Sequence, residues 1–398
     1  MAPADAAQNS DRAAGTGGAD RDVVAVELWR LPSDFFSLPP EEQWQALERV
    51  ISPAKKISKP RQPCEMSAGE EAIAVAFFLV VLGVPLLVPF VTVLLLATRS
   101  SCTTLWLALV GVLALHPMPK FKTWQRRNRI GVILAKYFTM TMLLDRSNPL
   151  FKEAGKRAVE DTPADVPLVC LACPHGVLNF GAIVWCFFSR WMCGLDQYTA
   201  SASVVKWVPG LRYLDPPMHC IGVSRQSLKR ALQERPRLRD ESGKAFDTRT
   251  VARGGMIGIV PDGIAGIFRC KPGQDVLFIG KKRGLMRICL EEGALIMGGW
   301  FSGTSEMFKI VVDPFGIMEA ISRKLQVSLF LFFGRWGSPV PHRSPVTLFA
   351  HTQKCTKNPA PTDEEVDTLH QEVYGGMVKV YDEMRHYAGY PDRRLAIL

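Results

Sequence analysis

The stretch AIAVAFFLVVLGVPLLVPFVTVLLLAT, residues 72–98, decides the class of this protein because it contains no ionisable side chain. As a helix it would be about 40 Å long at 1.5 Å per residue, enough to cross the hydrocarbon core of a bilayer. A second uncharged stretch, residues 100–119, follows Arg99. Soluble helices rarely run so far without a charge on their outer face, so we expect a membrane hairpin over residues 72–119. A buried pair of core helices is the alternative.

Basic side chains flank the expected hairpin on both sides. Those before it are Lys55, Lys56, Lys59 and Arg61, and those after it are Lys120, Lys122, Arg126, Arg127 and Arg129. Cations gather on the cytoplasmic side of membrane segments, which predicts an even number of crossings with both ends cytoplasmic. Pro85 and Pro89 are expected to kink the first stretch, and they leave a re-entrant element open as an alternative to a full span.

Composition narrows the remaining classes. With 398 residues and 47% apolar side chains, the chain is not intrinsically disordered, and ten cysteines are too dilute for a secreted disulfide scaffold. The net charge of +10 favours an anionic partner: nucleic acid, a membrane surface or a phosphate-bearing molecule. Because the cations gather beside the hairpin and no groove-reading module appears, we expect no nucleic-acid partner.

Three regions are expected along the chain. Residues 1–71 form a cytoplasmic, largely disordered N-terminal region with a short helix near residues 41–51, and residues 72–119 form the hairpin. From 120 to 398, short apolar runs alternate with helical ones, which predicts an α/β domain with a largely parallel sheet. Within it, residues 128–144 fit either an interfacial helix or a core helix.

A histidine follows the first expected strand of this domain. VPLVCLAC, residues 166–173, predicts a buried strand, and Pro174-His175-Gly176 comes directly after it. Open α/β folds bind ligands at the carboxyl edge of the sheet, where an imidazole could take a proton from a hydroxyl. A turn histidine without a catalytic role is the alternative. Cys170 and Cys173 should point to opposite faces of the strand, so we expect free thiols and no metal site.

A glycine-flanked basic run predicts an anion site. Gly280-Lys281-Lys282-Arg283-Gly284 precedes an expected helix, whose N-terminal amides and three neighbouring cations could hold a phosphate. A solvated basic turn is the alternative. Arg343 is a second candidate anion contact, with a loop ion pair as its alternative.

Taken in order, these blocks resemble the diacylglycerol acyltransferase type 2 family, which includes monoacylglycerol and wax-alcohol acyltransferases. The resemblance covers about residues 72–398. The family's His-Pro-His-Gly signature is met by Cys173-Pro174-His175-Gly176, and its Val-Pro-Gly-Gly-x-x-Glu block by residues 260–266. The other matching blocks are residues 220–228, Lys282-Arg283-Gly284, residues 293–297, 333–337, 345–347, 363–370 and 389–391.

Three positions depart from the family pattern. The first histidine of the signature is Cys173, so only His175 can inherit the role of a base. The glutamate of the glycine block is Gly266, with an acidic residue at Asp262 instead, and a strand proline is replaced by Met297.

The resemblance implies a glycerolipid-acyltransferase-like α/β domain and an acyl-CoA-dependent O-acyltransferase. Its acceptor would be diacylglycerol, giving triacylglycerol; wax-ester or monoacylglycerol synthesis, or a catalytically degenerate homologue, are the alternatives. His175 would be the general base within the turn of Pro174 and Gly176. The residues implied in substrate and CoA binding are Lys282, Arg283, Gly284, Arg343, Arg225, Asp262 and Gly263.

The resemblance also implies the setting of the reaction. No cofactor is expected, since acyl-CoA is a co-substrate, and no metal is expected. The partners are acyl-CoA and a lipid alcohol, and the chain would be embedded as a multi-pass protein in the endoplasmic reticulum membrane or sit on lipid droplets. A homo-oligomer is compatible with this interpretation.

Overall fold

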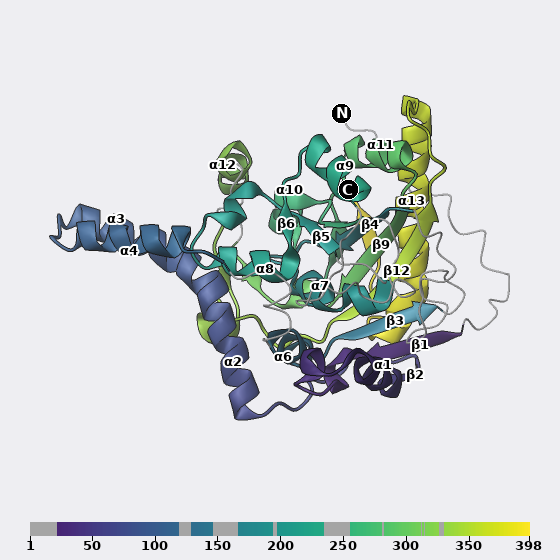
Figure 1. Ribbon diagram of the computed structural model, residues 1–398, viewed down its shortest axis with the longest axis horizontal. Helices are drawn as coiled ribbons and strands as arrows, with labels where there is room; N and C mark the ends of the chain where they lie inside the picture. The colour runs from purple at the N-terminus through teal and green to yellow at the C-terminus, as the bar shows by residue number, and fades with distance from the viewer. Residues whose placement is uncertain are drawn as a thin grey trace, which may run out of the picture.

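A mixed sheet forms the centre of the molecule. The computed structural model describes residues 22–118, 129–145, 166–193, 197–234, 255–280, 282–311, 313, 315–325 and 330–398. The strands of the central sheet are β1 (Val23–Glu27), β2 (Ile51–Pro53), β3 (Thr141–Asp145), β4 (Leu168–Cys173), β5 (Gln197–Ala200), β6 (Cys220–Ile221), β7 (Met256–Ile259), β9 (Leu295–Ser302) and β12 (Thr347–Lys354). Their spatial order is β2-β1-β3-β12-β9-β4-β7-β5-β6 (Figure 1).

The half of this sheet that carries β4 is parallel. The pairs β9–β4, β4–β7, β7–β5 and β5–β6 are all parallel, and so is β12–β3. The pairs β1–β2, β1–β3 and β12–β9 are antiparallel. Every residue of β4 is buried, as expected for a central strand covered on both faces. The prediction of an α/β architecture with a largely parallel sheet is therefore confirmed.

Helices cover both faces of the sheet. Their bounds are α1 (Pro40–Arg49), α6 (Ile130–Tyr137), α7 (Phe180–Cys193), α8 (Asp215–Met218), α9 (Arg225–Gln233), α10 (Gly263–Arg269), α11 (Gly284–Glu292), α12 (Ile317–Leu325) and α13 (Asp363–Ala388). One apolar cluster joins α6 and α7 to the sheet, and a second joins α9, α11 and α13 to it. Cys170 belongs to the first cluster and Cys173 to the second, so the two thiols face opposite ways and both are free, as predicted.

Among the described residues, four short strands lie outside the central sheet. Strand β8 (Asp275–Leu277) pairs in parallel with β13 (Leu395–Ile397). Strand β10 (Lys309–Ile310) pairs in antiparallel fashion with β11 (Phe332–Phe333).

Of the predicted run 128–144, the described residues 130–144 form core structure. All of α6 except Lys136 is buried, and β3 follows it directly, so the core-helix interpretation holds and the interfacial one is wrong. Residues 23–53, expected outside the α/β domain, supply β1, β2 and the predicted short helix α1. The strands of the sheet therefore come from both sides of the apolar stretches in sequence.

The apolar residues form a bent helix followed by a shorter one. Helix α2 (Ala68–Phe78), a π-helical turn (Leu79–Gly83) and α3 (Val84–Ala97) run without a break. Among the described residues this 30-residue helix alone is long and apolar enough to cross a membrane, judged by length and composition. The bend falls at the π turn, immediately before Pro85, which has no amide to donate to the preceding turn.

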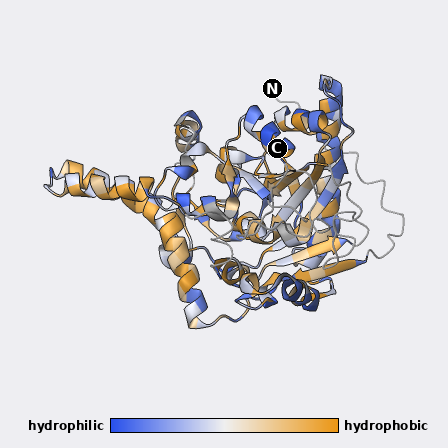
Figure 2. Cartoon of the chain, viewed as in Figure 1, coloured by the Kyte–Doolittle hydropathy of each residue, from blue (hydrophilic) through white to orange (hydrophobic). Residues whose placement is uncertain are grey.

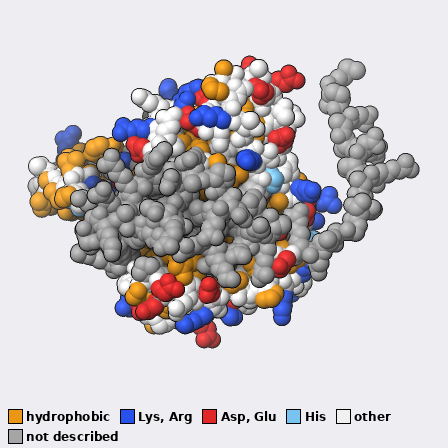
Figure 3. All heavy atoms as spheres, turned by 45° about the vertical axis from the view of Figure 1, so that its right-hand side comes forward, with side chains coloured by type: hydrophobic (Ala, Val, Ile, Leu, Met, Phe, Trp, Pro, Cys, Tyr) orange, Lys and Arg blue, Asp and Glu red, His pale blue; other side chains and the backbone are white. Residues whose placement is uncertain are grey.

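Helix α4 (Thr103–Leu115) lies beside α3, and the indole Nε1 of Trp106 donates to Thr92 Oγ1 at 2.9 Å. The α3–α4 pair projects away from the α/β domain (Figure 1), and its surface is hydrophobic in Figures 2 and 3. The outward side chains of Phe90, Val93, Leu105 and Val112 are all exposed. This helix pair accordingly presents an apolar surface that nothing else among the described residues covers.

Both ends of the apolar helices are tied to the domain. At the start, Glu70 accepts from Lys136 Nζ at 2.6 Å and Glu71 from Arg335 Nη1 at 2.6 Å. At the end of α4, the buried Arg212 donates to the carbonyls of Leu113 and His116, both at 2.8 Å. The helix pair is thus fixed in orientation relative to the domain.

Candidate active site

The turn after β4 presents His175 at the carboxyl edge of the parallel strands. The peptide bond Cys173–Pro174 is cis, and His175 follows it. The ring Nδ1 of His175 lies 3.0 Å from the carbonyl oxygen of Gly176. A carbonyl oxygen only accepts, so Nδ1 carries the proton in the neutral ring and Nε2 keeps its lone pair. This hydrogen bond therefore leaves Nε2 as the ring nitrogen that can accept a proton.

Asn179 holds the turn in place. Its Nδ2 donates to the carbonyl of Pro174 at 2.7 Å, while its Oδ1 accepts from the amide of Ala182 at 2.8 Å and so caps α7. Asn179 is not among the site residues predicted from the sequence. The available signal was an asparagine immediately before an apolar helical run, a common N-cap pattern.

Asp262 fixes the same turn from the neighbouring strand. It follows β7, and its Oδ2 accepts the backbone N–H of His175 at 3.0 Å. Only 1% of Asp262 is exposed, and its Oδ1 has no hydrogen-bond partner among the described residues. Burial raises the pKa of this carboxyl group, although the nearby His175 opposes the shift. Since Asp262 already engages the His175 amide, that amide is not available to stabilise an oxyanion.

The position of the carboxylate explains the glycine at 266. A Cβ added to Gly266 would lie 2.2 Å from Asp262 Oδ2, closer than any real Cβ contact. The two departures from the family block are therefore linked: the acid at 262 occupies the space beside residue 266, which must then lack a side chain.

Lys282 reaches the same corner. Its Nζ donates to the carbonyl oxygens of Pro261 and Asp262 at 3.0 and 3.1 Å. Gly263, which follows Asp262 in the chain, has a φ of +56°, a backbone conformation that residues with a side chain disfavour. Burial lowers the pKa of Lys282, and the charge of Asp262 opposes that shift. An ammonium group has three donors, so one remains for a ligand.

A cavity of about 1500 Å³ connects this corner with the apolar helices. His175, Asp262, Gly263 and Lys282 all line it. Most of the remaining wall is apolar, and part of it is contributed by Leu82, Pro85, Leu86, Pro89 and Phe90 of the bent helix. The acyl chain of a long-chain lipid lying between α3 and His175 could therefore stay in contact with apolar side chains.

Two further predicted site residues complete the turn. Pro174 and Gly176 are buried beside His175 and do not themselves line the cavity. Gly176 has φ of +58°, and an added Cβ would lie 3.0 Å from the methyl group of Thr304, so the turn needs a glycine there.

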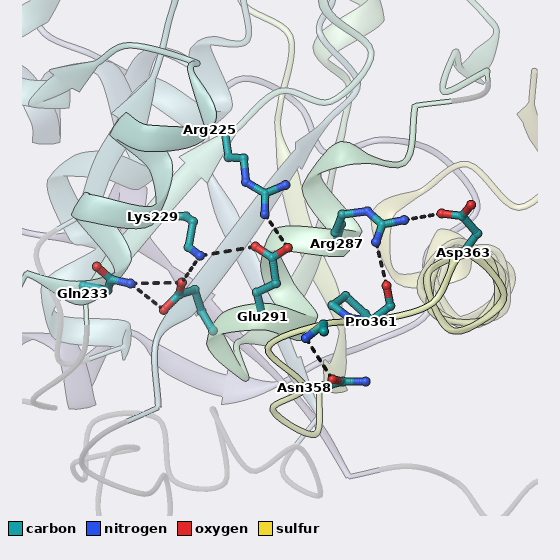
Figure 4. Close-up of polar contacts among 10 residues, drawn as sticks. Arg225, Lys229, Gln233, Arg287, Glu291, Asn358, Pro361 and Asp363 are labelled. Carbon is teal, nitrogen blue, oxygen red and sulfur yellow. Dashed lines mark hydrogen bonds and ion pairs between the residues drawn. The ribbon is translucent and has the colours of Figure 1, made fainter.

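The other predicted cations lie elsewhere. Arg283 pairs with Asp367 of α13, and Gly284 begins α11 without lining the cavity. Arg225 forms an ion pair with the buried Glu291, and the Nζ of Lys229 lies 3.4 Å from Oε2 of the same carboxylate (Figure 4). Lys281 lies outside the described residues. Of this basic run, Lys282 is the described cation that faces the cavity.

Arg343 is also used structurally. Its Nη2 donates to the carbonyl of Cys64, and its guanidinium lies 5.7 Å from the ring of Tyr137. It thereby holds the connector before α2 against α6 and does not line the cavity. In contrast, Arg323 of α12 lines the cavity and was not predicted, because its surroundings carry no recognisable motif.

Cys173, which stands where the family has its first histidine, faces away from this chemistry. It belongs to the apolar cluster on the other side of the sheet and is absent from the cavity wall. Burial raises the pKa of its thiol well above the usual range, which keeps it neutral. Replacing a histidine here removes no group from the cavity.

Comparison with known proteins agrees with the sequence resemblance. The family model described as diacylglycerol acyltransferase matches residues 119–397. Diacylglycerol O-acyltransferase 2-like protein 6 of Bos taurus is 23% identical over 53% of this chain and 64% of its own length. Acyl-CoA wax alcohol acyltransferase 2 of Mus musculus is 22% identical over 56% of this chain and 67% of its own.

Human diacylglycerol O-acyltransferase 2 is 25% identical over 55% of this chain and 57% of its own length. The match thus spans less than two-thirds of several of these relatives, including the bovine protein. No solved structure matches this chain. The family model covers well over half of the sequence, and the chain belongs to the diacylglycerol acyltransferase family.

Proposed function

We propose that this protein is an acyl-CoA-dependent O-acyltransferase that esterifies the hydroxyl of diacylglycerol to give triacylglycerol. The observation that carries the proposal is the apolar cavity, which has His175 in its wall together with Leu86, Pro89 and Phe90 of the apolar helix. A lipid alcohol entering beside α3 would bring its hydroxyl to the imidazole. Family membership supports the reaction class.

His175 acts as general base in this mechanism. Its Nε2 takes the proton of the acceptor hydroxyl while the oxygen bonds to the thioester carbonyl carbon. The carbon–sulfur bond then breaks, and the CoA thiolate leaves as the thiol after taking the proton back from the imidazolium. Neither a covalent acyl-enzyme nor a metal is needed for this sequence, and general-base catalysis of this kind contributes about 10²–10⁴ in rate.

Asp262 and Asn179 keep the imidazole in register through the backbone of its turn. Lys282 supplies the remaining donor for a CoA phosphate, and Arg323, which pairs with Glu319 at 2.7 Å, lies on the same cavity wall.

We further propose that the α3–α4 pair enters the membrane and returns on the same side. With 14 and 13 residues, these helices are each about 20 Å long, shorter than a hydrocarbon core of about 30 Å. Such a re-entrant pair agrees with the cations on both flanks and with cytoplasmic ends. The endoplasmic reticulum membrane and the lipid-droplet surface are the proposed locations; a multi-pass arrangement is the alternative.

The relatives differ most in the acceptor that their names give. Their names include 2-acylglycerol and wax alcohol acyltransferases, and the same cavity would serve those acceptors. A catalytically degenerate homologue is disfavoured, because Cys173 lies outside the cavity and the acid missing at Gly266 is supplied by Asp262.

Two experiments test the proposal. In membranes from cells that lack neutral-lipid synthesis, labelled acyl-CoA is offered with diacylglycerol, monoacylglycerol and a long-chain alcohol together, and triacylglycerol should be the main labelled ester. His175→Ala should abolish the product at an unchanged protein level, whereas Cys173→Ser should retain it. No ester with any acceptor would refute the enzyme assignment, and activity in His175→Ala would remove the histidine from its role.

A further inference from the structure

The face that α12 turns to solvent is apolar. Ile317, Ala320, Ile321 and Lys324 recur at the spacing of one helical face, and all four are exposed. Ile317 is 58% exposed and Ile321 43%, while Phe315, just before the helix, is 84% exposed. A helix at a protein–water boundary normally shows the reverse pattern, with its apolar stripe toward the core. We call Phe315, Ile317, Ala320 and Ile321 the α12 apolar face.

The inner side of α12 belongs to the cavity wall and is held there. Met318 and Arg323 line the cavity. Glu319 accepts from Arg269 of α10 at 3.0 Å, and Asp313 accepts the amides of Ile317 and Glu319 at 3.1 and 2.9 Å. The exposure of the α12 apolar face is therefore built into a capped helix fixed to α10, the helix that begins next to Asp262.

Other apolar residues at the rim of the cavity are also exposed. Leu331 both lines the cavity and is 56% exposed, and Phe90 of α3 does the same at 67%. Phe333, two residues after Leu331, is exposed as well. In Figure 1, α12 lies on the side from which α3 and α4 project. Helix α12, through Met318 and Arg323, and helix α3 thus border the same cavity, while the α12 apolar face points away from it.

We propose that the α12 apolar face lies in the membrane interface, so that the cavity opens at the level of the acyl chains between α12 and α3. The arrangement of charge favours a lipid surface over a protein partner: the exposed Lys324 stands at the end of the apolar stripe, as in helices that bury apolar residues below anionic headgroups. This inference rests on the membrane placement of α3 and α4 proposed above.

The main experiment measures depth in proteoliposomes that contain the full chain. An environment-sensitive fluorescent amino acid is introduced in place of Ile321, of Leu94 in α3, or of the exposed Leu398. At 321 we expect quenching by lipids brominated near the headgroup and protection from aqueous iodide, and at 398 the opposite. Iodide quenching at 321 together with lipid quenching at 94 would overturn this inference alone. Loss of lipid quenching at 94 would overturn the membrane placement as well.

Protection of position 321 from both quenchers would mean that protein, not lipid, covers this face, and would also overturn the inference. Kinetics supply a second readout. The double variant Ile317→Gln/Ile321→Gln should raise the KM for a long-chain acceptor in vesicles about tenfold, because less apolar surface holds the cavity at the membrane. The KM for a short-chain, water-soluble acceptor should stay unchanged, and Leu398→Gln should alter neither. Equal effects on both acceptors would refute the role of the face in lipid access.

Discussion

Exchanging Asp262 and Gly266 tests whether the buried carboxylate of Asp262 holds the turn of His175 in place. Asp262→Gly removes the acceptor of the His175 amide. Leaving a buried donor unpaired costs about 1–3 kcal/mol. Gly266→Glu forces a Cβ to within 2.2 Å of Asp262 Oδ2 and 2.4 Å of its Cγ. Overpacking of this kind also costs about 1–3 kcal/mol, before the repulsion between two buried carboxylates is added.

The double variant Asp262→Gly/Gly266→Glu should recover much of what each single variant loses, because the introduced carboxyl group enters the space that Asp262 vacates. If these costs fall on the positioning of His175, each single variant loses about 5- to 150-fold in kcat/KM. The double variant should then lie within about tenfold of the parent, which corresponds to a coupling free energy of at least about 0.5 kcal/mol for the smallest single losses and about 4.5 kcal/mol for the largest.

The assay is transfer of labelled acyl groups to diacylglycerol in microsomes, normalised to the amount of protein. Gly375→Ala is the matched glycine control, since a Cβ there meets no atom within 4 Å. Additive losses, or a double variant worse than either single one, would refute the idea that one carboxylate site is shared between positions 262 and 266.

Three further outcomes are expected. Lys282→Gln should raise the KM for acyl-CoA about tenfold, because one charge-assisted hydrogen bond to the substrate is lost. Arg225→Ala should mainly lower the Tm, because it leaves the buried Glu291 with fewer partners. Equal effects of the two variants on this KM would contradict the assignment of Lys282 to the cavity. Burial raises the pKa of Asp262 above 3.8, so the folded chain holds this proton to a higher pH than the unfolded chain, and stability falls as the pH rises through that window. The Tm of Asp262→Asn in detergent micelles should accordingly rise relative to the Tm of the parent as the pH increases and the parent's carboxyl group ionises. Parallel Tm curves for the two proteins would contradict the shift. A glycosylation acceptor inserted between Ser100 and Ser101 should stay unmodified in microsomes if α3 and α4 return on the same side, and its modification would establish a luminal loop and hence a full crossing.

The central part of the fold could be read from sequence because burial there is simple. Strands β4, β7 and β9 are covered on both faces, so they appear as uninterrupted apolar runs bounded by turns. The capping box of Thr362 and Glu365 marks the start of α13 in the same direct way. Periodicity and caps are local signals, and these elements depend on little else.

The edge of the sheet could not be read in this way. Helix α6 and strand β3 form one apolar run, and the break between them falls near Thr139, which adopts φ of +44° with no glycine or proline to announce it. Strand β1 pairs with β3 across more than a hundred intervening residues. Such partners are chosen by tertiary packing, which a single sequence does not display.

The same limit applies to the site. His175 and Asp262 were recognisable, yet their contact runs from a backbone amide to a side chain on a neighbouring strand. Lys282 and Arg283 are adjacent in sequence but diverge, because Arg283 turns toward Asp367 on the last long helix. A run of cations predicts an anion site only as long as none of its members has an acidic neighbour from a distant segment.

The bent helix forms part of the candidate site as well as an apolar projection. Since Leu82, Pro85, Leu86, Pro89 and Phe90 form one side of the chamber that holds His175, excising residues 72–119 to obtain a soluble fragment would leave that chamber open to water. The apolar helices and the α/β domain therefore build the cavity together, and the proposed activity is best assayed with the full chain in detergent or lipid.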